Sequence, residues 1–312
     1  MTAQVLTKSR REAFQACPRL HDYAYERGYR PAVEASVLRF GTLWHRGLEA
    51  WWDTAKLGAA PEERATAAVA ALHGGEPYDV AKAAALIRGY TLRWGAEPYE
   101  VLGVEVQFSA PLRSPTSGRL SPIWRLAGKL DAVVRDPDGR TLIVEAKSSS
   151  EDISAGSDYW LRLRLNGQVS AYYAGARTLG LDVWGCLYDV ARKPALRPYE
   201  PNTRRTEPES PEAYYVRCCE AIAEDPARYF ARGEVVRLDQ EMRDFDLDAW
   251  QVAQSIREAE RLGRWPRNPE ACVRYNRVCP FLPVCIGQAS LDDGSRYRRT
   301  DTMHEELAAA PT

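Results

Sequence analysis

The sequence has no apolar run long enough to cross a membrane. Its first residues, Met-Thr-Ala-Gln-Val-Leu-Thr-Lys-Ser-Arg-Arg-Glu, lack the apolar core of a secretory signal peptide. No internal repeat is visible. We therefore expect a soluble, cytoplasmic protein without a membrane partner. With 312 residues, 45% of them hydrophobic, the chain can bury a core of one large domain or two small ones.

Excess charge is also lacking, since the net charge at pH 7 is −1. This balance gives no argument for a nucleic-acid partner. Lysine is scarce, with six among the 42 basic residues. The planar guanidinium of arginine suits phosphates, but a GC-rich genome, whose codons favour arginine, explains the bias equally well. The scarcity gives weight to any lysine found at the end of an apolar strand.

Hydrophobic periodicity predicts an α/β order of elements. The expected helices cover 8–27, 36–57, 61–72, 79–95, 159–179, 211–230 and 246–262. The expected strands cover 100–109, 123–135, 140–147 and 181–190. Asp136-Pro137-Asp138-Gly139 predicts a hairpin turn, whereas 110–122 and 194–211 read as loops. The order helix, three strands, helix, strand predicts a mixed sheet flanked by helices, with helical additions at both ends.

One short apolar strand ends in charged residues. It reads Leu-Ile-Val-Glu-Ala-Lys over 142–147 and follows Gly128-Lys129-Leu130-Asp131. Side chains alternate along a strand, so Glu145 and Lys147 share a face, and Asp131 joins them if the two strands pair. Two carboxylates that can hold a hard divalent cation, beside an amine, suit metal-assisted phosphodiester hydrolysis. An edge hairpin with solvated charges is the alternative.

Two further motifs are weak individually. His45 lies on an otherwise apolar helix, where a lone histidine is usually a packed or surface residue. Gln168 and Tyr172 are four residues apart and share a helix face. Together and in order, the motifs resemble the RecB-like branch of the PD-(D/E)XK nuclease superfamily. That family has a histidine on an early helix, a G-x-x-D strand, an E-x-K strand and a Q-x-x-x-Y helix. The resemblance covers about residues 10–190, and the cysteines extend it to 285.

The resemblance implies a restriction-endonuclease-like α/β fold and a metal-dependent active site. Four residues would bind Mg²⁺ or Mn²⁺: His45, Asp131, Glu145 and, through its carbonyl, Ala146. Lys147 would assist the attacking water, and Gln168 and Tyr172 would shape the site or touch DNA. Glu105 matches an acidic position often seen on the family's first strand, and a partner for a nearby arginine is its alternative role.

Seven cysteines, an odd number, argue against a disulfide framework when no signal peptide is present. Cys272, Cys279 and Cys285 cluster in a turn-rich segment, and Cys17 is the best candidate for a fourth ligand. The resemblance implies that these four hold a [4Fe–4S] cluster of structural role that joins the two chain ends. Zinc and ordinary reduced thiols remain alternatives, since thiolates also bind zinc and the spacing departs from the commoner C-x2-C-x5-C.

Side chains that would contact DNA are of two kinds. The basic candidates are Arg162, Arg164, Arg192, Lys193, Arg197, Arg204 and Arg205, which would grip phosphates or lie on solvated loops. The aromatic candidates are Trp44, Trp51, Trp52, Tyr172 and Tyr173. Aromatic rings can stack on bases, but core packing is the expected role for most of them.

The expected function is a metal-dependent DNA nuclease, specifically an exonuclease in recombination, repair, phage or CRISPR-associated processing. The alternatives are an endonuclease of the same fold and a non-catalytic DNA-binding or scaffold module. The intact Asp131, Glu145 and Lys147 argue against the non-catalytic module. Expected partners are single- or double-stranded DNA ends and a helicase, recombinase or CRISPR-adaptation protein. One nuclease domain is expected over 1–286, with its core at about 36–190 and a helical, Cys-rich part at about 211–286. Residues 287–312 are expected to be a disordered tail.

Overall fold

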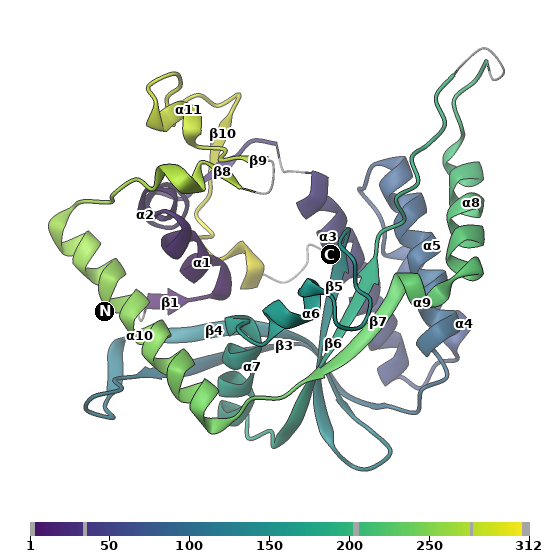
Figure 1. Ribbon diagram of the computed structural model, residues 1–312, viewed down its shortest axis with the longest axis horizontal. Coiled ribbons are helices and arrows are strands. Elements are labelled where there is room, and N and C mark those ends of the chain that lie inside the picture. Colours follow the sequence, from purple (N-terminus) through teal and green to yellow (C-terminus); the bar gives the residue numbers. More distant parts are fainter. Residues whose placement is uncertain (1–3, 34–35, 202–205, 275–276, 308–312) are drawn as a thin grey trace.

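A mixed six-stranded sheet forms the centre of the computed structural model, which describes residues 4–33, 36–201, 206–274 and 277–307 (Figure 1). Its strands are β1 (Gln4–Leu6), β3 (Glu100–Arg113), β4 (Leu120–Arg135), β5 (Thr141–Ser149), β6 (Val183–Arg192) and β7 (Phe230–Val235). The order is β1-β4-β5-β6-β7, and β3 pairs with β4 on its other edge. Pairing is parallel in β1–β4 and β5–β6 and antiparallel in β3–β4, β4–β5 and β6–β7. The expected restriction-endonuclease-like α/β fold is confirmed.

Helices cover both faces of this sheet. They are α1 (Lys8–Ala16), α2 (Pro18–His21), a π-helix (Asp22–Glu26), α3 (Ser36–Lys56), α4 (Pro61–Ala70), α5 (Pro77–Trp94), α6 (Asp158–Leu163), α7 (Gly167–Thr178), α8 (Pro211–Glu224), α9 (Pro226–Tyr229), α10 (Asp239–Leu262) and α11 (Leu282–Cys285). One hydrophobic cluster joins α3, α4, α5 and α8 to one sheet face. A second joins α6 and α7 to the other face, and a third joins α10 to β1, β3 and β4. In the described part of the chain, no helix combines the length and apolarity that a membrane span requires.

The β4–β5 hairpin forms at the expected turn. Asp136 accepts hydrogen bonds from the backbone N–H groups of Asp138 (3.0 Å) and Arg140 (2.9 Å). Gly139 has φ = +81°, a conformation that costs little without a Cβ. The local turn chemistry therefore sets the register that pairs Ala132 with Val144.

Three segments differ from the sequence-based expectation. The loop expected at 110–122 is shorter, because β3 runs to Arg113. Pro111 is tolerated there since β3 is an edge strand that needs hydrogen bonds on one side only. The helix expected at 159–179 is interrupted after Leu163, and Asn166 starts α7 anew by accepting a hydrogen bond from the Gln168 N–H (2.8 Å). Helix 8–27 is also divided, at Cys17-Pro18.

Periodicity missed two strands of the central sheet, β1 and β7. The helix expected at 211–230 ends near Pro226, and Phe230 begins β7 instead.

β7 carries Arg232, a charged side chain that is only 7% exposed and forms an ion pair with the 2% exposed Asp189 at 2.8 Å. The Tyr90 hydroxyl donates to Asp189 (2.7 Å) and accepts from Arg232 (2.9 Å). A buried ion pair is tolerated only when further groups form hydrogen bonds with it, as Tyr90 does here. The sequence of the strand does not reveal such partners.

The N- and C-terminal segments lie side by side (Figure 1). Asn268 Nδ2 donates to the Ala16 carbonyl (2.8 Å), and the Arg19 N–H donates to the Pro266 carbonyl (3.1 Å). Strand β10 (Tyr297–Arg299) pairs with β2 (Tyr29–Pro31), and the Tyr297 side chain is buried. The described part of 287–312 therefore differs from the disordered tail that was expected. Residues 308–312 lie outside the described part.

Candidate active site

The site forms where β4 and β5 diverge. They pair from Ala132–Val144 to Arg135–Thr141, and β1 occupies the same edge of β4 only around Trp124–Leu126. Beyond the last β4–β5 pair, the Ala146 N–H lacks a ladder partner on β4, and the Asp131 Oδ2 accepts its hydrogen bond instead (2.9 Å). Because buried backbone N–H groups need a partner, the divergence of the strands draws Asp131 next to the Glu145–Lys147 segment.

The predicted residues converge at this point. Lys147 forms an ion pair with Glu145, whose side chain has no exposed surface. His45, on α3, approaches from another element, and its Nδ1 lies 3.5 Å from the Asp131 Oδ2. Ala146 is buried between the two charged residues of its strand. The structure thus brings together the residues that the sequence motifs named, which come from α3, β4 and β5.

Burial and the charges of neighbouring residues shift the pKa values of these groups. Burial, and then the charge of Glu145, raise the pKa of Asp131 to about 7. Burial and the positive charge of Lys147 lower the pKa of His45 to about 4, so this imidazole is neutral at neutral pH. Burial alone would lower the pKa of Lys147, but the charges of Glu145 and Asp131 outweigh it and raise that pKa. Lys147 is therefore a fixed cation rather than a base.

Gln168 and Tyr172 line the same site from α7. The Gln168 Nε2 donates to the Tyr172 hydroxyl at 2.5 Å. Burial, and then the nearby charges of Glu145 and Asp131, raise the pKa of Tyr172 well above its ordinary value. The start of α7 at Asn166 sets the direction in which both side chains point.

Sequence reasoning missed Lys8. Its ammonium, at the start of α1, donates to the Gln168 Oε1 at 2.9 Å. Burial, and then repulsion by Lys147, lower its pKa. Lys8 is thus a second ammonium at the edge of the carboxylate cluster. The scarcity of lysine, which drew attention to Lys147, applied equally to Lys8, but 160 residues separate it from Gln168.

Glu105 and Gly128 have roles beside the site. Glu105 lies opposite Asp131 between paired residues of β3 and β4, forms an ion pair with Lys129, and has φ = +51°. A non-glycine residue with positive φ stores about 1–2 kcal/mol of strain, which often marks functional sites. Its partner is a lysine, not the arginine considered as an alternative. A Cβ at Gly128 would lie 2.7 Å from the Phe108 ring, so this glycine makes room for packing.

The donor chemistry of the site fits a divalent cation. Both Glu145 carboxylate oxygens are buried, and the Lys147 ammonium lies against one of them. Asp131 adds hard oxygens and His45 adds a neutral ring nitrogen, which are ligand types used for Mg²⁺ and Mn²⁺. However, the described residues contain no group of three or more His, Cys, Asp or Glu side chains arranged as a ready metal site. Lys147, rather than a second carboxylate, neutralises Glu145 as the side chains stand.

The four predicted cysteine ligands line one cavity of about 700 Å³, between α1–α2 and the 264–286 segment. None is in a disulfide. The Asn268 N–H donates to the Cys17 Sγ at 3.4 Å, and the Cys279 N–H donates to the Cys272 carbonyl at 2.7 Å. Burial raises the pKa of both Cys279 and Cys285. The cavity gathers thiols from both chain ends, although the described cysteines too fall short of a ready metal site.

The expected DNA contacts divide into four groups. Trp44, Trp51, Trp52, Tyr172 and Tyr173 are buried, so they pack in the core and do not offer free faces to bases. Arg162 is exposed and forms an ion pair with Glu151, and Arg164 is exposed nearby. Arg192, Lys193 and Arg197 line a cavity beyond the ends of β5 and β6. Arg204 and Arg205 lie outside the described residues.

A mixed sheet with an aspartate, an E-x-K strand and a helical histidine at its diverging strands defines the architecture of a nuclease. The model of the PD-(D/E)XK nuclease superfamily matches residues 5–286, and the chain belongs to this superfamily. No curated protein matches the chain significantly. Among solved structures, the crystal structure of SSO0001 is similar, with 15% sequence identity and a TM-score of 0.33, over 80% of this chain and 85% of that chain. A similarity of this size carries no argument about function.

Proposed function

We propose that the protein is a divalent-metal-dependent deoxyribonuclease of the RecB-like branch, acting as an exonuclease on DNA ends. Superfamily membership indicates a nuclease. The observation that carries the finer proposal is the convergence of Asp131, Glu145, Lys147 and His45 where β4 and β5 diverge. Recombination, repair, phage or CRISPR-associated processing is the proposed setting, with a helicase, recombinase or adaptation protein as partner.

Each residue has a proposed role in this reaction. Asp131, Glu145, His45 and the Ala146 carbonyl would hold Mg²⁺ or Mn²⁺, which when bound polarises the phosphate and acidifies a water molecule. The neutral His45 imidazole has its lone pair available for this purpose. Lys147, which stays charged, would hold the attacking water and balance charge that builds on the phosphate. Gln168 and Tyr172 would shape the site, and Gln168, the more exposed of the two, would touch the DNA strand.

We also propose that the cysteine cavity holds a [4Fe–4S] cluster, with zinc as the alternative occupant. Support comes from four thiols, from both chain ends, that line one cavity without forming disulfides. The role would be structural, because the bound centre would join α1–α2 to the C-terminal segment.

End-labelled single- and double-stranded DNA, with Mg²⁺, Mn²⁺ or EDTA, tests the nuclease proposal. Asp131→Ala, Glu145→Ala and Lys147→Ala should each lower the cleavage rate at least about 100-fold and leave DNA binding measurable. Asp138→Ala, an exposed aspartate in the turn of the same hairpin, is the matched control and should cut normally. Cleavage at the wild-type rate by any of the three variants would show that the site is misplaced.

Closed circular DNA separates the two nuclease alternatives. An exonuclease leaves the circle intact and degrades it once it is linearised, whereas an endonuclease cuts both forms. A protein that binds DNA and cuts neither form with any of the metals would be the non-catalytic module.

A further inference from the structure

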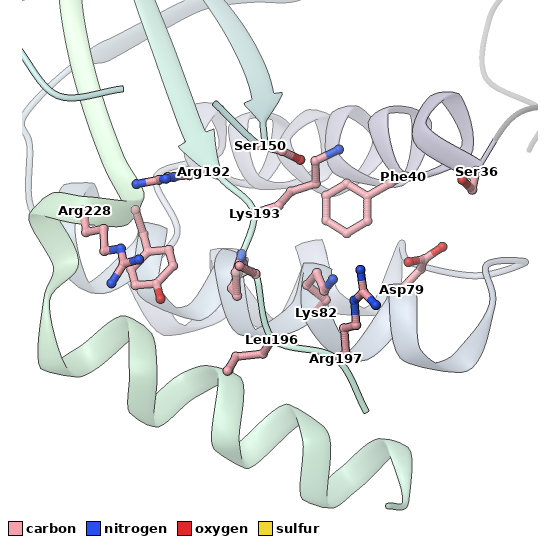
Figure 2. A pocket seen from close by; sticks show the side chains of 13 residues that line it. Ser36, Phe40, Asp79, Lys82, Ser150, Arg192, Lys193, Leu196, Arg197 and Arg228 are labelled. Carbon is pink, nitrogen blue, oxygen red and sulfur yellow. The ribbon is translucent and has the colours of Figure 1, made fainter. Parts of the chain in front are cut away.

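A second cavity, of about 320 Å³, lies beyond the C-terminal ends of β5 and β6. Its walls come from the first turns of α3 and α5, the segment that follows β6, and α9. Figure 2 shows the side chains converging from these elements. Its lining is strongly basic: the cations are Lys82, Arg192, Lys193, Arg197 and Arg228, and Asp79 is the one acidic residue among the lining residues.

The positive charge of this cavity is balanced only in part, by Asp79. None of the five cations makes an ion pair with an acidic residue in the described part of the chain. Arg217, just outside the cavity, behaves differently, because it forms an ion pair with Glu209 at 2.6 Å. Charges gathered without counter-ions raise the local potential and attract an anion. The start of α3 at Ser36 adds the positive end of a 21-residue helix.

The wall that carries these cations is held in place by the protein itself. The Lys193 N–H donates to the Ser149 carbonyl (2.7 Å), which extends the β5–β6 ladder. Tyr214 donates to the Leu196 carbonyl (2.8 Å), and Arg217 donates to the Arg197 carbonyl (2.7 Å). The segment is therefore preorganised before any ligand binds.

Lys193 is the central cation of the cavity. Its ammonium lies 5.0 Å from the centre of the Phe40 ring, a cation–π contact that fixes its position. Burial, and then repulsion by Lys82 and Arg277, lower the pKa of Lys193. This repulsion is the electrostatic cost that a bound anion would remove.

The cavity lies close to the candidate active site along two elements. Phe40 precedes His45 by five residues on α3, which is about 7.5 Å along the helix axis. Ser150 follows Lys147 by three residues after β5, which is about 10 Å of extended chain. Each nucleotide of a strand advances about 3.4 Å along the axis of a duplex. Along either element the two sites are therefore within about 10 Å of each other, a span of about one to three nucleotides.

We propose that this cavity binds the terminal phosphate of a DNA strand and thereby positions the strand end relative to the metal site. A terminal phosphate carries a charge of about −1.5 to −2, against −1 for an internal phosphate, and suits a concentration of unpaired cations. A cavity walled by three helices and the segment after β6 suits a strand end better than a strand that continues past it. The proposal rests on the proposed nuclease function and adds how that nuclease recognises an end.

Three fluorescent DNA strands of one sequence test this proposal: one with a 5′-phosphate, one with a 3′-phosphate, and one with hydroxyls at both ends. Binding is measured by anisotropy in EDTA, and cleavage is measured separately with Mg²⁺ or Mn²⁺. A phosphate at one of the two ends should tighten binding about tenfold, or about 1.4 kcal/mol. Lys193→Met should bind the phosphorylated strand and the hydroxyl-ended strand with nearly equal affinity. Lys193→Arg should keep most of the preference for the phosphorylated strand.

Lys56→Met is the matched control, because it removes a lysine from the far end of α3 and should keep the preference of the wild type. Equal binding of all three strands by the wild type would overturn the proposal. An equal loss of affinity by Lys193→Met on all three strands would also overturn it, because it would mean that Lys193 contacts internal phosphates. The two proposals fail separately, since cleavage without end preference rejects only the cavity, and end preference without cleavage rejects only the nuclease.

Discussion

Asp131→Asn should abolish cleavage and yet stabilise the metal-free protein above neutral pH. Asp131 is 16% exposed and lies beside the fully buried Glu145, so its negative charge is unfavourable without a cation. Asparagine has nearly the same shape, and its carbonyl oxygen can still accept the hydrogen bond from the Ala146 N–H. The substitution therefore removes the charge and keeps the local geometry.

The size of the effect follows from the pKa of Asp131. Burial and Glu145 raise it from 3.8 to about 7 in the folded protein. At 1.36 kcal/mol per pKa unit, this shift corresponds to at most about 4 kcal/mol, and relaxation of the surroundings reduces it to about 2–4 kcal/mol. Because the folded pKa is the higher one, the stability that this carboxyl contributes is complete below pH 3.8 and is lost as the pH rises through 7. The asparagine variant does not suffer this loss.

Urea denaturation in EDTA at several pH values measures the difference. The variant and the wild type should be equally stable near pH 4, and the variant should lead by about 2–4 kcal/mol at pH 8. Adding Mg²⁺ or Mn²⁺ should stabilise the wild type and not the variant. Asp53→Asn, an exposed aspartate on α3, should show neither effect. A variant that is less stable than the wild type at pH 8 in EDTA, or a difference that does not grow with pH, would refute the reasoning.

Three further substitutions test other parts of the structure. Lys8→Met should lower the cleavage rate about tenfold by releasing the glutamine that Lys8 holds, with little change in melting temperature; an unchanged rate would remove Lys8 from the site. Cys272→Ser should abolish the visible absorbance of anaerobically purified protein, or its bound zinc. Cys218→Ser, which changes a buried thiol elsewhere, should keep the metal, and loss of the metal in both variants would contradict the assignment. Tyr90→Phe should lower the free energy of unfolding by about 1–3 kcal/mol, because it removes a hydroxyl that bridges a buried ion pair. If calorimetry shows no change in stability, water replaces the hydroxyl.

The sequence alone determined the local features of this protein. The hairpin turn, the shared face of Glu145 and Lys147, and the spacing of Gln168 and Tyr172 depend on residues a few positions apart. Their geometry follows from the periods of strand and helix. The α/β class followed from the order of the elements, and the family resemblance added His45 and the four cysteines, which no periodicity connects.

Tertiary structure decided what joins distant segments. Lys8 reaches Gln168, and Arg232 finds a buried partner on the neighbouring strand, only after the sheet has formed. β7 became a strand because an edge of β6 was available to it, and no local pattern records that edge. The basic cavity likewise assembles from α3, α5, α9 and the segment after β6. The physical reason is the same in each case: burial and pairing energies depend on neighbours in space, whereas sequence patterns report only neighbours along the chain.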